Sequence, residues 1–492
     1  MGKLSTLASD TVVYGASTIL SRLIGWLMMP LYTHVVSKSI YGSFSYIYSF
    51  ISIFLVLVTL GFETGYFRFV TGDNKDKLLG TLSNAVLGFG GMLLCACIAF
   101  PSLFVSMLDF EFGASNETFL WLMMSIVLLD SYNALFFAEL RYERQSMKYA
   151  LLRLLQVLVN VILTVFFLFY LRNQEGYFSE VHDITYMMLA NLVGSLFATV
   201  VFIKRIVRVI MKIDFSLFKT VLLYSLPLVG MGFFGQANTN IEKILIRHLD
   251  TSADSFEQLG IYSACYKIGV LMSIFTQSFR MAFEPFFFKE NKDKGDTKIY
   301  SDALNYFVAF GLLIFAGVML YWPLIFKIIE QSYWEGKVIL PYILIGQLFF
   351  GVYYSLSLWY KVTDRTYWGI IMSAIGLTVN TVMNFILIPR IGYLGAAVST
   401  FVGYTVMMAL TYILGQKYYP IAYSVGRISI FMLLVVIVVM GTEYSYQYIG
   451  NYWIAVSVPA MVLTIFLLLR FLRLDIRTVV SAVKSKIGRK RA

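Results

Sequence analysis

Charge is scarce in this sequence, and cysteine and histidine are nearly missing. Only 14% of the 492 residues are Asp, Glu, Lys or Arg. A soluble domain carries roughly 25%, so an ordinary soluble fold is excluded. The three cysteines and three histidines show no disulfide framework and no metal-binding spacing. No nucleophile elbow, phosphate-binding glycine loop or catalytic pair of carboxylates is evident. We therefore expect no catalytic residue, no metal and no cofactor.

What the sequence has instead is apolar length. Hydrophobic residues make up 59% of the chain, and the mean hydropathy is +0.74. A membrane-spanning helix needs about 20 mostly apolar residues, and we find about fourteen such stretches. They lie at roughly 11–34, 40–62, 80–108, 118–140, 149–171, 184–203, 220–241, 258–282, 303–326, 338–360, 367–388, 391–415, 428–442 and 452–469. We predict an all-α integral membrane protein with about fourteen spanning helices.

The distribution of positive charge tests this count. With a cytoplasmic N-terminus, the inside segments hold 28 of the 39 lysines and arginines, the outside segments hold 7, and 4 lie within spans. One missed helix would exchange all later loops between the two sides, so the bias supports the count and predicts that both termini are cytoplasmic. The same topology explains the net charge of +11, and no nucleic-acid partner is expected. The basic segment 470–491 has two interpretations. It either fixes the orientation of the last helix as a stop-transfer flank, or it contacts an anionic membrane leaflet.

The first half of the sequence recurs weakly in the second half. Residues 42–48 read GSFSYIY and residues 260–266 read GIYSACY, which pairs Gly42 with Gly260, and Asn160 pairs with Asn380 at nearly the same offset. A repeat of six helices enters the membrane twice from the same side. This predicts two pseudo-symmetric lobes related by an axis along the membrane normal, with a transport site between them. The predicted parts are an N-lobe at 1–203 (helices 1–6), a basic cytoplasmic linker at 204–219, a C-lobe at 220–415 (helices 7–12), helices 13 and 14 at 416–470, and a basic cytoplasmic tail at 471–492.

Four cations lie inside the apolar stretches, namely Arg22, Arg153, Lys267 and Arg280. Charges within a membrane usually face a bundle interior or a water-filled cavity. Arg22 and Lys267 lie near the middle of their stretches, which predicts a basic cavity and an anionic cargo that both residues bind. A guanidinium group matches phosphate oxygens bidentately. For Arg22, the alternative is an internal ion pair with Asp130.

Asp130 is the acid in the middle of the stretch 118–140. Besides pairing with Arg22, it could be a protonation site that couples transport to a proton gradient. Burial raises a carboxyl pKa, whereas a neighbouring cation lowers it. Both interpretations stay open.

Charged residues also gather at the predicted cytoplasmic helix ends. An interlobe gate of salt bridges is one interpretation, and its candidates are Glu63, Arg68, Glu139, Arg153, Arg280 and Glu284. For the two arginines close to helix ends, the alternative is that the long side chain reaches the membrane interface.

The stretch 220–241 contains Pro227, Gly230 and Gly232. Proline frees a backbone carbonyl group and glycine weakens a helix, so we expect a bend. The bend is either the moving part of a transporter or a static kink.

Several segments together resemble one known family. They are SRLIGWLMMPLYTHVVSKSIYGSFSY at 21–46, LPLVG at 226–230, GIYS at 260–263, Asn380, and GYLGAA at 392–397. The chain resembles the polysaccharide transporter family, the Wzx-type oligosaccharide and O-antigen flippases of the MOP superfamily. The resemblance implies two MATE/MOP-like six-helix lobes that alternate between inward-open and outward-open states. It also implies a bacterial inner-membrane location, a lipid-linked oligosaccharide as cargo, glycan polymerase machinery as a possible partner, and a monomer.

Relatives within the superfamily narrow the cargo. Lipid II flippases resemble this chain at Arg22 and Lys267, but they carry a further Arg-Asp where this chain has Trp26-Leu27-Met28-Met29.

The hypothesis is a flippase that moves a polyprenyl-pyrophosphate-linked oligosaccharide from the cytoplasmic to the outer leaflet. The alternatives are a cation or drug antiporter, whose relatives favour an acid where Arg22 stands, and a membrane glycan polymerase or ligase, which usually needs a large outer loop.

Overall fold

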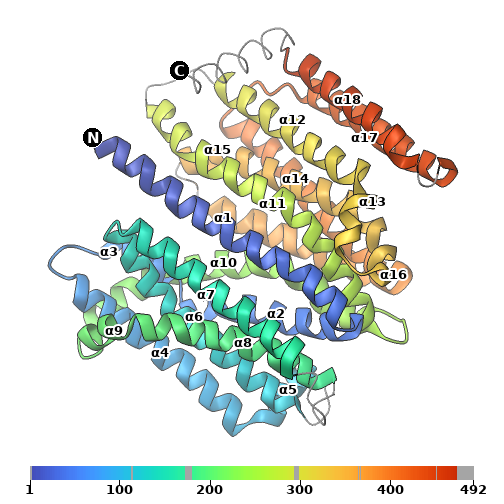
Figure 1. Cartoon of the computed structure of the whole chain (residues 1–492). Coiled ribbons are helices and arrows are strands. Elements are labelled where there is room, and N and C mark those ends of the chain that lie inside the picture. The colour runs from blue at the N-terminus through green and yellow to red at the C-terminus, as the bar shows by residue number, and fades with distance from the viewer. Residues whose placement is uncertain are drawn as a thin grey trace, which may run out of the picture. The chain divides into compact units, whose positions relative to one another are not determined.

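The computed structural model describes residues 3–111, 115–171, 180–292, 298–363, 365, 367–449 and 452–473. Within these ranges every regular element is a helix (Figure 1). The chain divides into two compact units, each built from two segments. Unit 1 comprises residues 1–264 and 377–396, and unit 2 comprises residues 265–376 and 397–492.

Unit 1 is built around α6, which packs against α2, α4 and α8. Its helices are α1 (Lys3–Val35), α2 (Lys38–Thr59), α3 (Phe62–Phe69), α4 (Lys75–Ala99), α5 (Pro101–Met107), α6 (Asn116–Tyr142), α7 (Ser146–Phe166) with a π-helical end (Phe167–Leu171), α8 (Glu180–Val201), α9 (Ile203–Val209) and α10 (Phe215–Leu249), together with the helical residues 255–264 and 377–396. The ring of Phe202 stacks on Phe136 at 5.5 Å and meets Phe137 edge-on at 5.1 Å. These aromatic contacts hold the end of α8 against α6.

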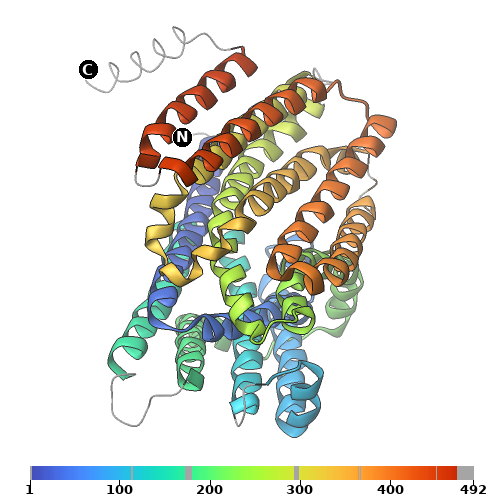
Figure 2. The ribbon, with the colours of Figure 1, turned by 90° about the vertical axis from the view of Figure 1, so that its right-hand side faces the viewer.

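In unit 2, α12 packs against α14, α17 and α18. The helices that contribute to this unit are α11 (Ser255–Lys292, from residue 265), α12 (Lys298–Leu320), α13 (Trp322–Ile325), two 3-10 helices (Phe326–Ile328 and Gln331–Ile339), α14 (Leu340–Leu356), α15 (Leu358–Val362), α16 (Tyr367–Tyr418, in part), α17 (Val425–Ile449) and α18 (Trp453–Phe471). The last two helices run side by side in both views (Figures 1 and 2).

Twelve helices in the described part of the chain are long and apolar enough to cross a membrane. One of them, α16, is two helices joined at a kink, where Ile391 and Gly392 leave helical geometry. Gly392 has a φ of 57°, a conformation that glycine adopts without strain. Counting the two halves of α16 separately and adding α1 reaches the predicted number. The all-α membrane fold is confirmed, whereas the lobe and linker boundaries stay a prediction.

Several predicted helix ends are wrong by two turns or more. Among them, α1 begins at Lys3 and not at 11, and α11 ends at Lys292 and not at 282. The end of α10 is a further case. The apolar pattern ended at residue 241, but α10 continues to Leu249. Cations ended the apolar pattern, and in the structure they are paired instead of solvated. Lys243 donates to Asn240 Oδ1 at 3.1 Å, and Arg247 donates to Ser255 Oγ at 3.0 Å. The extension brings Glu242 into a spanning helix.

Candidate functional site

The two predicted cargo-binding cations belong to different units. Arg22 is an exposed side chain on α1, which packs along α7 in unit 1. Lys267 is half-buried on α11, in unit 2. Its neighbour Tyr266 accepts a hydrogen bond from Gln347 Nε2 at 3.1 Å, and a Cβ atom at Gly269 would overlap the side chain of Ile343. Close packing against α14 therefore fixes the turn of α11 that presents Lys267.

Asp130 is held by neutral donors from two other helices. Its Oδ1 atom accepts a hydrogen bond from Ser195 Oγ at 2.6 Å and a longer one from Gln156 Nε2 at 3.4 Å. Asn133, almost one turn later, donates to Ser195 O at 2.9 Å. A carboxyl group inside a spanning helix is costly and marks a functional site by default. The predicted ion pair with Arg22 stays a prediction.

Three of the predicted gate residues, Glu63, Arg153 and Arg280, have local partners. Glu63 accepts a hydrogen bond from Arg141 at 2.5 Å, and Arg68 is exposed on α3. Arg153 lies over the ring of Phe137 at 4.2 Å, and Arg280 lies over the ring of Tyr354 at 4.9 Å. The side chain of Glu284 is outside the described residues. The cation–π contacts account for the two arginines locally, and the gate stays a prediction.

Around the predicted bend, α10 continues through Pro227 as one helix. A Cβ atom at Gly232 would lie 2.9 Å from Val56 Cγ1 on α2, whereas one at Gly230 would meet nothing within 4 Å. Gly232 thus allows α10 to approach α2, and a moving bend stays a prediction.

Glu139 was also a candidate for the predicted gate, and it stands at the centre of a network of ion pairs within unit 1. This carboxylate is fully buried, with 0% side-chain exposure, and accepts from Arg205 at 2.6 Å, from Arg208 at 2.6 Å and from Lys75 at 3.2 Å. A buried carboxylate needs such partners. The network fastens α9, part of the predicted linker, to α4 and α6. The sequence signal for this network is an acidic residue near the end of an apolar stretch, Glu139, followed later in the chain by a run of basic residues that includes Arg205 and Arg208.

Outside the spanning segments, Glu143 extends this network, and Asp214, within the predicted linker, forms a separate ion pair. Burial alone would raise the pKa of Glu143, but Lys75 and Arg205 outweigh it and hold that pKa below its ordinary value. The pKa of Asp214 is also lowered, first by Lys77 at 2.8 Å and then by the backbone N–H of Leu217. Asp214 caps the first turn of α10. The linker is therefore anchored at both of its ends.

We expect Glu139→Gln to lower the thermal stability of the purified protein strongly. Removing one partner of a buried ion pair costs about 3–5 kcal/mol, and here three cations would lose their shared carboxylate. Thermal unfolding in detergent checks this, with Glu117→Gln as the control because Glu117 is exposed on the same helix. Equal melting temperatures for the two variants would contradict the role of Glu139.

A second buried carboxylate, Glu242, was assigned to a loop and so missed. It is 0% exposed on α10, and Tyr262 donates to its Oε1 at 3.3 Å. In the same unit, Asn380 donates to Asn238 Oδ1 at 3.3 Å, and Asn384 donates to Asn380 Oδ1 at 2.9 Å. The bond of Asn380 joins α16 to α10, as polar side chains within spanning helices commonly do.

At the predicted outer side, the first turns of α2 and α11 touch through glycine. A Cβ atom at Gly42 would overlap the carbonyl oxygen of Phe256, and a Cβ atom at Gly260 would overlap that of Lys38. Beside them, Lys38 Nζ lies 3.0 Å from Glu257 Oε1. Gly42 and Gly260 are partners in the predicted repeat, so equivalent helices meet at equivalent residues. We call this contact the outer crossing.

A cluster of polar side chains adjoins the outer crossing. Tyr46 donates to Leu108 O at 2.9 Å, and its hydroxyl oxygen lies 3.2 Å from His248 Nε2. The other ring nitrogen of His248 lies 3.2 Å from Asp109 Oδ2, and Arg247 pairs with Glu111. The end of α10 is thereby attached to α2 and to the segment after α5.

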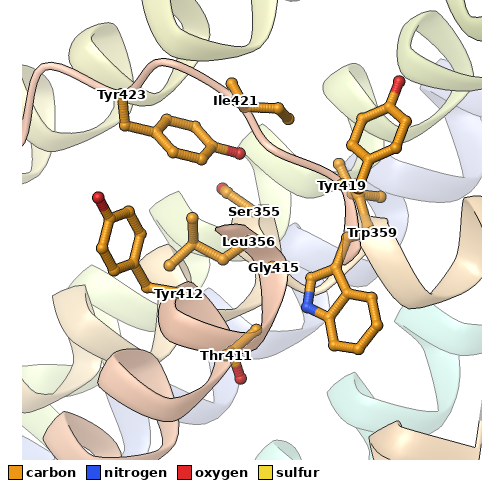
Figure 3. A pocket seen from close by; sticks show the side chains of 10 residues that line it. Ser355, Leu356, Trp359, Thr411, Tyr412, Gly415, Tyr419, Ile421 and Tyr423 are labelled. Carbon is orange, nitrogen blue, oxygen red and sulfur yellow. The ribbon is translucent and has the colours of Figure 1, made fainter. Parts of the chain in front are cut away.

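An aromatic pocket in unit 2 lies between residues 355–359 and 411–423 (Figure 3). The rings of Tyr412 and Tyr423 line one side, and Trp359 and Tyr419 line the other. Its volume is about 10 Å³. A space of that size holds roughly one water molecule, so it does not fit a sugar ring in this structure.

The polysaccharide biosynthesis protein family matches residues 7–291, more than half of the chain. The chain belongs to this family. The resemblance in the sequence is thus confirmed, and family membership covers α1 to α10 and most of α11.

Individual relatives of this family member are distant. The Lsg locus putative protein 1 of Haemophilus influenzae is 24% identical over 314 residues, which cover 62% of this chain and 71% of the relative. An uncharacterized membrane protein of the same organism is 21% identical over 302 residues, or 60% and 68% of the two chains.

Solved structures show that the family member has the fold of the MOP superfamily. The lipid II flippase MurJ in an inward closed conformation matches with a TM-score of 0.72 and 17% identity, covering 93% of this chain and 99% of that one. A multidrug resistance MATE transporter of the MOP superfamily, in an inward-facing conformation, matches with a TM-score of 0.57 and 14% identity, covering 81% and 97%. At these identities the likeness shows the fold alone.

Proposed function

We propose that this protein is a flippase that moves a polyprenyl-pyrophosphate-linked oligosaccharide from the cytoplasmic to the outer leaflet by alternating access. The observation that carries the proposal is the presence of Arg22 in the long helix α1 and of Lys267 in the candidate span within α11, in a chain of the polysaccharide biosynthesis family. Its fold, shared with a lipid flippase and with drug transporters, supports transport in place of catalysis. The protein would lie in the bacterial inner membrane with both termini in the cytoplasm.

The chemistry of the two cations fits a pyrophosphate. A guanidinium group offers a fork of N–H donors to two oxygens of one phosphate, and a lysine ammonium group acts as a compact point charge on the other. In this proposal Arg22 and Lys267 hold the pyrophosphate, and the polyprenyl tail stays in the lipid. The cationic side chains also disfavour a cationic drug, because like charges repel.

The outer crossing gives the alternating-access proposal a physical element. In the present structure the backbones at Gly42 and Gly260 are in contact, and Lys38 pairs with Glu257. This contact closes the outer ends of α2 and α11 in our proposal. Release of the glycan to the outside would require the two first turns to separate and the ion pair to break.

Transport of a fluorescent polyprenyl-pyrophosphate oligosaccharide in proteoliposomes tests the function. We expect the purified protein to make cargo in the inner leaflet accessible to an external quencher much faster than protein-free liposomes do. Folded protein that moves no such cargo, but exchanges a cationic drug for protons, would contradict the proposal and support a drug antiporter.

We further propose that Asp130 couples transport to a proton gradient. Ser195 and Gln156 bind the carboxyl group whether or not it is ionised, since both are neutral. We expect Asp130→Asn to retain flipping without a gradient and to lose the stimulation that an imposed proton gradient gives wild type. Measuring wild type and Asp130→Asn with and without the gradient separates a coupling role from a structural one. In a structural role, Asp130→Asn would lower the rates with and without the gradient equally.

A further inference from the structure

A basic pocket opens between α17 and α18, the two helices that follow the predicted repeat. Its volume is about 270 Å³, and three of its lining residues are Arg427, Arg470 and Arg473. None of its lining residues is acidic. Three guanidinium groups around one pocket repel each other unless an anion lies between them, so the charge pattern fits an anionic ligand.

The three arginines differ in what else they bind. Arg427 donates to Phe471 O and lies over the Phe471 ring at 5.4 Å, so it joins the start of α17 to the end of α18. Arg470 and Arg473 form no ion pair or side-chain hydrogen bond with other described residues. Arg473 has a left-handed backbone with a φ of 55°, which is uncommon for a residue other than glycine. These two guanidinium groups are available to a ligand.

The rest of the pocket is lined by apolar side chains, two of which are exposed on the outside of the helix pair. Ile430 is 62% exposed and Leu434 is 40% exposed, one turn apart on the same face of α17, and Leu467 of α18 lies beside them in the lining. From Arg427 to Leu434 the helix rises about 10 Å. An anionic group at the membrane surface would thus continue into an apolar groove, which is the layout of a phospholipid.

We propose that this pocket binds one anionic glycerophospholipid of the membrane, with its phosphate between the three arginines and an acyl chain along Ile430 and Leu434. Charge complementarity argues for a lipid over the chain's own C-terminal segment. Residues 474–492 contain six basic residues and only one acidic residue, so that segment would repel the arginines. The lipid is a separate ligand from the transported cargo, and its binding does not depend on the proposed flippase activity.

Native mass spectrometry of the full-length protein tests the site. With added phosphatidylglycerol, we expect wild type to retain one lipid molecule, and to retain far less phosphatidylcholine. For Arg470→Gln with Arg473→Gln we expect at least tenfold weaker retention, because each basic residue near the surface adds attraction for anionic lipid. Arg427 is left intact because it also joins the two helices. The control is Lys204→Gln with Lys219→Gln, two exposed cations remote from the pocket in sequence.

Further measurements distinguish the sources of phosphate. Leu434→Trp would fill the groove while leaving the arginines, so it should weaken lipid retention without preventing folding, which gel filtration checks. Unchanged retention by the double arginine variant would overturn the proposal. Equal retention of phosphatidylcholine, displacement by millimolar inorganic phosphate, or preferential binding of polyprenyl pyrophosphate would each overturn it as well.

Discussion

Gly42→Ala and Gly260→Ala should each abolish the closed outer crossing and stop transport. The added methyl group of either variant would occupy the position of a backbone carbonyl oxygen, that of Phe256 or of Lys38. Backbone cannot rotate away as the end of a side chain does, so the first turns of α2 and α11 must separate. A transporter that cannot close its outer side stays outward-open and no longer accepts cargo from the cytoplasm.

Cross-linking measures this separation directly. In a variant without Cys95, Cys97 and Cys265, we would place cysteines at Lys38 and Glu257, whose charged atoms lie 3.0 Å apart. A short bismaleimide should join them efficiently in the glycine background and at least tenfold less in the Gly260→Ala background, which corresponds to a shift of about 1.4 kcal/mol.

Gly88→Ala is the matched control, since Gly88 lies in α4 and a Cβ atom there meets nothing within 4 Å. Alanine in place of glycine normally stabilises a helix by roughly 0.5–1 kcal/mol. Lost cross-linking in Gly260→Ala but not in Gly88→Ala therefore isolates the steric effect. Unchanged cross-linking and transport in Gly260→Ala would refute the closure. If that variant does not fold, Glu257→Lys tests the same contact through charge repulsion.

The second large effect is expected for the double variant Arg22→Ala, Lys267→Ala. Hydrogen bonds to charged groups contribute about 1.5–3 kcal/mol each, so losing two of them corresponds to at least a hundredfold slower flipping. We would measure initial rates of cargo movement in proteoliposomes at matched protein density. Wild-type rates in the double variant would exclude a pyrophosphate-binding role for the two cations.

Conservative variants separate charge from geometry. Arg22→Lys keeps the charge but loses the bidentate fork, so its rate should fall between those of wild type and Arg22→Ala. The control is Lys204→Ala with Lys219→Ala, which removes two cations from the predicted linker. If that control slows flipping equally, net charge and not a specific site would explain the effect.

The membrane fold could be predicted because apolar length and the side preference of cations are local properties of the sequence. The kink in α16 is an example, since two separate apolar stretches were predicted at 367–388 and 391–415, and the helix breaks at Ile391 and Gly392. The end of α10 could not be predicted. Lys243 and Arg247 resemble loop residues until their partners Asn240 and Ser255 are known.

By itself, the sequence determined the all-α membrane class, the approximate number of spans, the family and the presence of cations within spanning helices. These follow from composition, from periodicity and from short segments. Only the tertiary structure decided that Glu139 binds three cations, that Asp130 binds Ser195, and that Gly42 and Gly260 meet. The physical reason is that such contacts join residues distant in sequence, and their energy depends on distances and burial that exist only after the helices have packed.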